Sequence, residues 1–274
     1  MIIAGAAAGT LLVANPVHTL KEIVKGVTLV IGGSKFNKQR YLDALKMMYD
    51  LFGRIRRDGP ASVENDIEAP KESKFFANYP GFLKDEETRD FVCDTMRMAI
   101  MGGVEPFDLD QMVEADMDVR SHEMSQPVTA LSTMADSLPG LGIVAAVLGV
   151  VLTMSALGGP PEEIGKKVAA ALVGTFLGIL LCYGFIGPIA ANLSKLGAEE
   201  HEYWHVLRVT MIAFMKGTSP LLSTEMGRRA IPGHLRPTFQ EFEINCKRAV
   251  AAAAAAAPAG DAPAAAPEAA PAAE

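Results

Sequence analysis

Two apolar stretches decide the fold: LPGLGIVAAVLGVVLTMSAL at residues 138–157 and VAAALVGTFLGILLCYGFIGPIAANL at residues 168–193. Neither stretch contains an Asp, Glu, Lys, Arg or His. A helix needs about 20 mostly apolar residues to cross the hydrocarbon core of a membrane. We therefore predict that each stretch is a membrane-spanning helix, and that the short segment 158–167 between them is a hairpin.

The remainder of the chain is suited to water. Of the 274 residues, 50% are hydrophobic, but 21% are charged, and these charged residues must lie outside the bilayer. The formal net charge is −7, and no block of Lys and Arg resembles the surfaces that bind nucleic acid. Three widely spaced cysteines without a C-x-x-C motif indicate reduced thiols and a cytosolic soluble portion.

The distribution of Lys and Arg predicts how the chain crosses the membrane. Of 25 such residues, 15 lie within residues 16–137, 8 follow residue 193, and only Lys166 and Lys167 lie in the hairpin. Loops rich in Lys and Arg stay in the cytoplasm. We therefore expect residues 15–137 and 194–248 to be cytoplasmic and the hairpin 158–167 to be periplasmic.

The first residues, 1–14, are apolar but only about half as long as a membrane span. No basic residue precedes them. We expect this segment to be the end of a membrane helix whose beginning lies outside this chain. The alternative is a short buried or interfacial helix.

Helical periodicity dominates the predicted cytoplasmic part. Apolar residues recur at helical spacing from Tyr41 to Ile55, and Gly59-Pro60 ends that helix. A second helix is predicted to begin near Asp85, a favourable N-cap residue, and to end at Gly102-Gly103.

Further helices are predicted on either side of the two spans. One covers residues 109–122, and after Pro127 the chain becomes helical again and leads into the first span. Beyond the second span, residues 195–216 continue as a helix. Residues 249–274 are almost wholly Ala and Pro, which predicts a disordered tail. The predicted fold class is all-α: polytopic membrane helices with a mostly helical cytoplasmic domain and few or no strands.

The composition of the two spans indicates how they pack. Small residues recur four apart, a spacing that lets helix backbones approach closely: Gly142 with Ala146, Ala145 with Gly149, and Ala170 with Gly174 and Gly178. The hydroxyl of Thr175 lies among these glycines and is expected to face protein or water. Ionisable residues inside a membrane usually mark an ion pathway. Since neither span has one, any titrating carboxylate must come from a partner.

Several longer motifs resemble the MotA family of flagellar motor stator proteins, part of the MotA/TolQ/ExbB proton channel family. The sequences DSLPGLGIVAAV at residues 136–147, VGTFLGIL at 173–180 and YGFIGP at 183–188 are similar to its third and fourth transmembrane helices. RRDG at 56–59 and SVENDIEAP at 62–70 match its cytoplasmic domain. The resemblance runs from residue 1 to about residue 248. The resemblance does not include the family's first transmembrane helix, and residues 1–14 match the end of its second.

The resemblance implies a stator subunit of the bacterial inner membrane that converts ion flow, of protons rather than sodium, into torque. Five copies would surround two helices of MotB, which supplies the proton-accepting aspartate. Pro139, Thr175 and Pro188 would line the ion path, and Arg56 and Glu64 would engage the rotor protein FliG. We expect no enzymatic activity, no cofactor and no metal, and the charge distribution predicts no nucleic-acid partner.

A related alternative is an energiser of the ExbB or TolQ type, which shares the threonine-bearing span but powers processes at the outer membrane. The large cytoplasmic domain and the stretch from Arg56 to Pro70 favour the stator.

A remote alternative is a membrane zinc metalloprotease, because residues 201–205 read HEYWH. In the H-E-x-x-H motif, two imidazoles on one helical face bind zinc and the glutamate acts as general base. Here these residues would be His201, Glu202 and His205. The pattern is short, and no third ligand can be identified.

Overall fold

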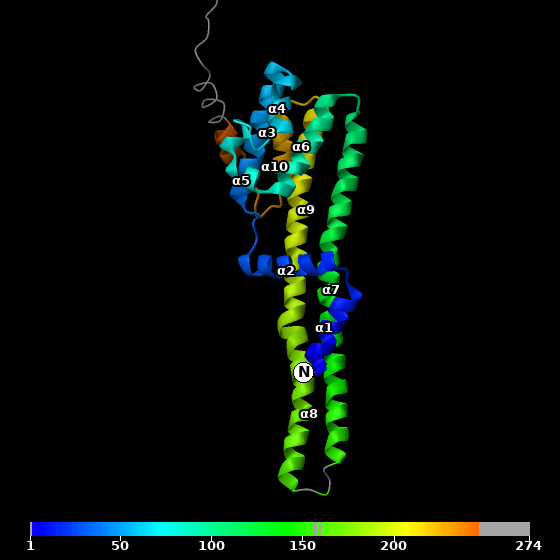
Figure 1. The fold of residues 1–274 in the computed structure, drawn as a ribbon. Helices are drawn as coiled ribbons and strands as arrows, with labels where there is room; N and C mark the ends of the chain where they lie inside the picture. Colours follow the sequence, from blue (N-terminus) through cyan, green and yellow to red (C-terminus); the bar gives the residue numbers. More distant parts are fainter. Residues whose placement is uncertain (1, 156–157, 159, 247–274) are drawn as a thin grey trace, which may run out of the picture.

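Two long antiparallel rods run the length of the molecule in the computed structural model, which describes residues 2–155, 158 and 160–246 (Figure 1). The first rod is α7 (Pro106–Met154). The second joins α8 (Pro161–Leu181), the π-helical turn η3 (Cys182–Ile186) and α9 (Gly187–Met215). The helices α3, α4, α5, α6 and α10 gather around one end of the rods, and α1 and α2 lie beside their middle (Figure 1). Among the described residues there is no strand, which confirms the all-α fold.

Each rod contains an 18-residue window long and apolar enough to cross a membrane, and only 17% of each window is buried within the chain. The core helix of a soluble protein would be mostly buried instead. Large apolar side chains such as Val144, Leu172 and Phe176 are exposed on the rods. Such surfaces suit helices that face lipid or other membrane helices.

The predicted interruption between residues 122 and 127 is wrong, because α7 continues through both Pro127 and Pro139. A proline inside a helix removes one backbone hydrogen bond and costs about 3 kcal/mol. Pro127 is buried, and the next turn places Ala130 and Leu131 in a cluster with Ile23 and Leu193. Packing against neighbouring helices thus holds α7 continuous where local propensity alone would end it.

A large hydrophobic core, here called the soluble core, forms at one end of the rods. There α3 (Lys38–Asp58), α6 (Glu86–Met101) and α10 (Pro220–Ala230) pack around the N-terminal part of α7 and the C-terminal part of α9. The predicted helices ending at Gly59 and Gly102 are confirmed, and both glycines have positive φ. The Asn37 side chain caps α3 by accepting a hydrogen bond from the backbone N–H of Arg40 at 2.9 Å. Stacked rings of Phe52 and Phe214, 4.1 Å apart, join α3 to α9.

Short helical segments connect α3 to α6. They are the 3₁₀ turn η1 (Pro60–Val63), α4 (Glu64–Glu68), the 3₁₀ turn η2 (Phe76–Asn78) and α5 (Pro80–Lys84). Val63, Ile67 and Phe76 are fully buried in the core. These three anchors fix the segment to the core, and the partly buried Phe75, Tyr79, Phe82 and Leu83 pack beside them.

The first two helices lie beside the rods. α1 (Ile2–Ala14) packs along α7 and buries Ala7 in a cluster with Ala135, Leu138 and Cys182. The helix α2 (Val17–Gly32) crosses both rods at a steep angle (Figure 1). The crossing is close: a Cβ added at Gly26 would lie 2.8 Å from Cδ2 of Leu193. Sequence analysis did not predict α2.

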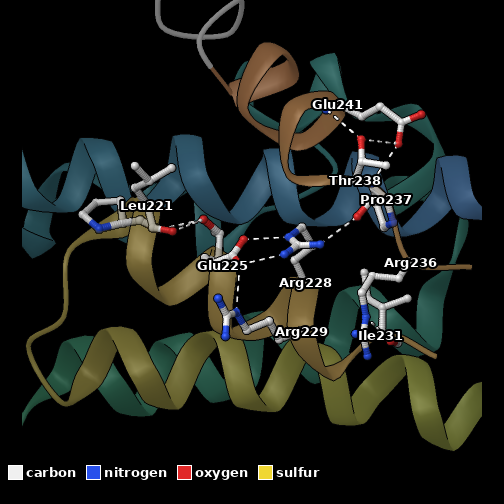
Figure 2. Close-up of polar contacts among 11 residues, drawn as sticks. Leu221, Glu225, Arg228, Arg229, Ile231, Arg236, Pro237, Thr238 and Glu241 are labelled. Carbon is white, nitrogen blue, oxygen red and sulfur yellow. Dashed lines mark hydrogen bonds and ion pairs between the residues drawn. The ribbon is translucent and has the colours of Figure 1, made fainter. Parts of the chain in front are cut away.

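The segment after α10 folds back onto the soluble core through a polar cluster (Figure 2). The Glu225 carboxylate accepts hydrogen bonds from Arg228 at 2.7 Å and Arg229 at 2.9 Å, and Arg228 also donates to the Pro237 carbonyl at 2.8 Å. Thr238 and Glu241 then form a reciprocal capping box at the start of the helix at 239–246. The predicted tail at 249–274 lies outside the described residues.

Candidate functional site

A seam of glycine and alanine holds α7 against α8. A Cβ added at Gly178 would lie 2.6 Å from the Leu138 carbonyl oxygen, and one added at Gly149 would lie 2.5 Å from Cβ of Ala171. The two backbones therefore touch, which confirms the prediction from small-residue spacing. Gly174 and Gly178 contact α7 as predicted. Ala170 was predicted wrongly, because it is exposed and Ala171 makes the contact instead.

Thr175 lies on this seam and is half-buried. Its hydroxyl donates to the Gly142 carbonyl oxygen across the seam at 3.4 Å, near the upper limit for a hydrogen bond. By contrast, the Thr153 hydroxyl on α7 donates to the carbonyl of Gly149 in its own helix at 2.8 Å. Thr175 therefore faces protein, as expected. Because its hydrogen bond is long, the hydroxyl can exchange it for a shorter one to another hydrogen-bonding group.

Pro188 follows a π-helical turn. The N–H of Gly187 donates to the Cys182 carbonyl, five residues earlier, and Pro188 has no N–H to donate. Widening the helix by one residue accommodates the proline ring without ending the rod, and such π turns are frequent at functional sites. Pro188 is exposed, as are the neighbouring Tyr183 and Phe185. Sequence analysis identified the proline but not the π turn.

Pro139 lies on the opposite side of the seam from Thr175. It is half-buried and follows Leu138, whose carbonyl contacts Gly178. Pro139 and Thr175 therefore flank one short section of the seam, whereas Pro188 comes thirteen residues after Thr175, about 20 Å further along the rod. That these three residues line an ion path stays a prediction.

The two charges predicted to contact a partner are both exposed in the soluble domain. Arg56 lies in the last turn of α3, and Glu64 is the first residue of α4. Neither side chain forms an ion pair or a hydrogen bond with a described residue. Unpaired charges held on helices can pair with a charged partner without first breaking an internal ion pair.

A polar clamp that sequence analysis missed fixes the relative positions of these two charges. Arg54 on α3 forms an ion pair with Asp66 at 2.7 Å and donates to the Ser62 carbonyl at 3.0 Å. The Ser73 hydroxyl donates to the same carboxylate at 2.6 Å. Asp66 lies within the SVENDIEAP stretch, so the motif carried the signal, but its partner Arg54 could be identified only in the fold.

The H-E-x-x-H residues occupy a helix of the soluble domain. Tyr203 and Trp204 are buried in the core, and Trp204 stacks on Phe91 at 5.6 Å. His205 is exposed, and partial desolvation together with nearby Arg208 lowers the pKa of its imidazole. Within the part of the chain that the structure describes, no group of three or more His, Cys, Asp and Glu side chains is arranged to hold a metal ion.

Comparison with known proteins gives consistent matches. Residues 1–59 match the family described as motility protein A N-terminal, and residues 83–205 match the MotA/TolQ/ExbB proton channel family. Motility protein A of Salmonella typhimurium is 38% identical over 243 residues, which cover 89% of this chain and 82% of that protein. Chemotaxis protein LafT of Vibrio parahaemolyticus is 34% identical and covers 89% of this chain and 85% of that protein.

Two solved structures share the fold. The C. jejuni MotAB structure matches with a TM-score of 0.67 and 17% identity, over 84% of this chain and 81% of that one. The flagellar MotAB stator complex from Bacillus subtilis matches with a TM-score of 0.66 and 18% identity, over 89% and 85%.

The seam generates a testable prediction. Gly178→Ala places a methyl group against the Leu138 carbonyl, so the helices must separate, and we expect a loss of about 1–3 kcal/mol in the free energy of unfolding. Gly140→Ala is the matched control, because a Cβ at Gly140 meets no atom within 4 Å. Thermal unfolding of the two purified variants in detergent measures the difference. Equal midpoints for Gly178→Ala and the control would contradict the close contact.

Proposed function

The chain belongs to the motility protein A family of flagellar stator proteins, and we propose that it couples inward proton flow to torque on the flagellar rotor. The observation that supports this mechanism most directly is the seam between α7 and α8. It offers the weakly engaged hydroxyl of Thr175 in a membrane segment that has no ionisable residue of its own. Such a segment suits an ion path whose titrating group is brought by another chain.

The partner that we propose is MotB, because the two solved relatives are complexes named MotAB. Its membrane helix would supply the aspartate that accepts the proton. The exposed apolar faces of both rods give such a helix, and further copies of this chain, a surface to pack on. We propose that five copies surround the MotB helices in the bacterial inner membrane.

Thr175, Pro139 and Pro188 would respond to the charge on that aspartate. A threonine hydroxyl can donate to a carboxylate and can accept from a protonated carboxyl group, so Thr175 can interact with both states. Because Pro188 cannot donate, a carbonyl in the preceding turn lacks its usual helical partner. Small changes in local hydrogen bonding would then bend the rod at η3.

In the second rod, α9 connects the π turn η3 to the soluble domain. α9 runs without interruption from Gly187 to Met215 and carries Tyr203, Trp204 and Phe214 into the soluble core. A change in the tilt of α9 at η3 would therefore move the domain that holds Arg56 and Glu64. We propose that these two charges contact the rotor protein FliG.

The energiser reading of the ExbB or TolQ type is not favoured. The relatives with the highest identity quoted above are a motility protein and a chemotaxis protein, and the match extends to residues 1–59, the motility protein A N-terminal region.

The proposed topology can be tested with introduced cysteines in intact cells. A thiol at Glu162→Cys should react with an impermeant maleimide, while a thiol at Ser62→Cys should react only after the membrane is permeabilised. The native Cys93, Cys182 and Cys246 are buried, which keeps their background reaction low. Labelling of Ser62→Cys alone in intact cells would show that the topology is inverted.

The rotor contact predicts an effect of charge reversal on motility. Arg56→Glu or Glu64→Lys should each reduce swimming, and because the contact is exposed, each should weaken the interaction by about 1 kcal/mol. A compensating reversal on the rotor should restore part of the loss.

Asp118→Lys is the matched control, because Asp118 is exposed on α7 and has no ion-pair partner among the described residues. If the Arg56→Glu, Glu64→Lys double variant swims as fast as wild type at normal stator levels, these charges do not take part in the mechanism.

The proposed role of Thr175 predicts a hydroxyl requirement. Thr175→Val keeps the shape of the side chain but removes its hydrogen bond to a charged group, so ion flow and swimming speed should fall about tenfold. Thr175→Ser should retain most of the speed. Thr153→Val is the control, because that hydroxyl bonds only within its own helix. Normal swimming by Thr175→Val cells would remove the hydroxyl from the ion path.

A further inference from the structure

A cavity of about 570 Å³ lies where α2 crosses the two rods. Its apolar lining includes Gly26, Leu29, Leu193 and Leu196, and its polar lining comes from α2, α7, α9, the start of α6 and Lys35. The volume falls within the usual range for sites that bind small molecules or cofactors. Leu193 ends the second predicted span, so the apolar side of the cavity adjoins the segment proposed to lie in the membrane.

Two buried groups of opposite hydrogen-bonding character line this cavity: an indole N–H without a partner and a carboxylate that is held by a single lysine. Trp204 is 3% exposed, and its indole N–H has no hydrogen-bond partner in the described structure. Glu200, four residues earlier on the same face of α9, is 7% exposed. Its Oε1 lies 3.0 Å from Nζ of Lys35, an ion pair, but makes no well-directed hydrogen bond. Buried polar groups without partners are rare and costly.

The cations around the cavity are already engaged. Lys35 is shared between Glu200 and Asp85, whose carboxylate it approaches to 3.8 Å. Lys25 lies 3.6 Å from Glu22 and 3.4 Å from Glu87. Burial raises the pKa of Glu200 despite the nearby Lys35, which shows that this lysine only partly offsets the loss of water.

Acidic residues outnumber basic residues in the lining. The acids are Glu22, Asp85, Glu86, Glu87, Glu123 and Glu200, and the bases are Lys25, Lys35 and Arg120. Arg120 lies over the Trp204 ring, 4.7 Å from its centroid, and pairs with Asp116 at 3.3 Å. The surplus of negative charge favours a ligand with a cationic group and disfavours one that is purely anionic.

We propose that this cavity binds the headgroup of a zwitterionic aminophospholipid, of the phosphatidylethanolamine type. The primary ammonium donates to the Glu200 carboxylate, and a phosphate oxygen accepts from the Trp204 indole N–H. Residues four apart on a helix are about 6 Å apart, a spacing that one ethanolamine phosphate can bridge. The acyl chains leave along Leu29 and Leu193 toward the bilayer.

A lipid fits the cavity better than a soluble amine does. Along α9, Leu193 and Leu196 lie nearer the proposed membrane span, and Glu200 and Trp204 lie nearer the soluble core. Acyl chains would meet the two leucines, and a headgroup would meet the two buried polar side chains. The inference rests on the proposed membrane position of the second span and does not depend on ion conduction. A chain that bound the lipid but drove no motor would leave this inference intact.

The test is native mass spectrometry of the intact stator complex, incubated with equal amounts of phosphatidylethanolamine, phosphatidylcholine and phosphatidylglycerol. We expect about tenfold stronger retention of phosphatidylethanolamine, because the quaternary ammonium of phosphatidylcholine has no N–H to donate and phosphatidylglycerol has no cation.

Two near-isosteric variants test the assigned contacts. Trp204→Phe keeps a ring against Phe91, and Glu200→Gln keeps the side-chain shape, and each should lower retention of phosphatidylethanolamine about tenfold. Glu202→Gln, an exposed residue on the same helix and outside the cavity lining, should bind as wild type does.

Three results would overturn the proposal. One is equal retention of the three lipids by the wild-type complex, a comparison that needs no variant to fold. Another is displacement of the lipid by an equal concentration of soluble glycerophosphoethanolamine, which would make the site one for a free headgroup. The third is that no lipid is retained, as expected if a neighbouring copy of the chain fills the cavity.

Discussion

The close contact between the backbones of α7 and α8 is the constraint on which the rest of the structure depends. At Gly142 and Gly178 no side chain separates the helices, so the rods can approach until backbone atoms are in van der Waals contact. In a membrane, where lipid is as apolar as the helix surface, such packing provides much of the attraction between helices. The same contact places Thr175 between the backbones and directs its hydroxyl across the seam.

The continuity of the rods extends this local contact to the soluble domain. α7 passes through two prolines, and the second rod passes through a π turn, yet neither is interrupted. Both rods therefore end inside the soluble core, where Phe214 stacks on Phe52 of α3. Because α3 also carries Arg54 and Arg56, the clamp to Asp66 is attached to the same hydrophobic core as the ends of the rods. A bend near Pro188 would thus reach the exposed charges without passing through a flexible linker.

Features that depend on local composition could be predicted from the sequence. The two spans, the glycine-lined contact and the helices ending at Gly59 and Gly102 follow from apolar length, small-residue spacing and residues that favour positive φ. Features that depend on tertiary packing were missed. The continuation of α7 through Pro127 is one such feature, because that residue is buried only in the fold. The helix α2 was also missed, although Leu20, Ile23, Val27 and Val30 recur at helical spacing and pack in the same cluster as Leu193.

The candidate site could be predicted as a set of residues but not as an arrangement. The motifs named Pro139, Thr175 and Pro188 as residues of an ion path, which stays a prediction, and the structure places the first two beside the seam. The π turn before Pro188 arises from how the backbone accommodates the proline, which spacing does not reveal. The unpaired Trp204 indole and the nearby Glu200 carboxylate could not be predicted either. In the sequence, Trp204 lies within the short H-E-x-x-H pattern and Glu200 directly precedes it, and nothing there shows that both side chains are buried beside a cavity.

The central claim is that the spans of this chain carry no titrating group and depend on a partner carboxylate for ion flow. Proton uptake into vesicles tests it most directly, with this chain alone, with MotB, and with a MotB variant whose membrane aspartate is replaced by asparagine. We expect uptake only when this chain and the unaltered partner are present together. Robust uptake by vesicles that contain this chain alone would contradict it.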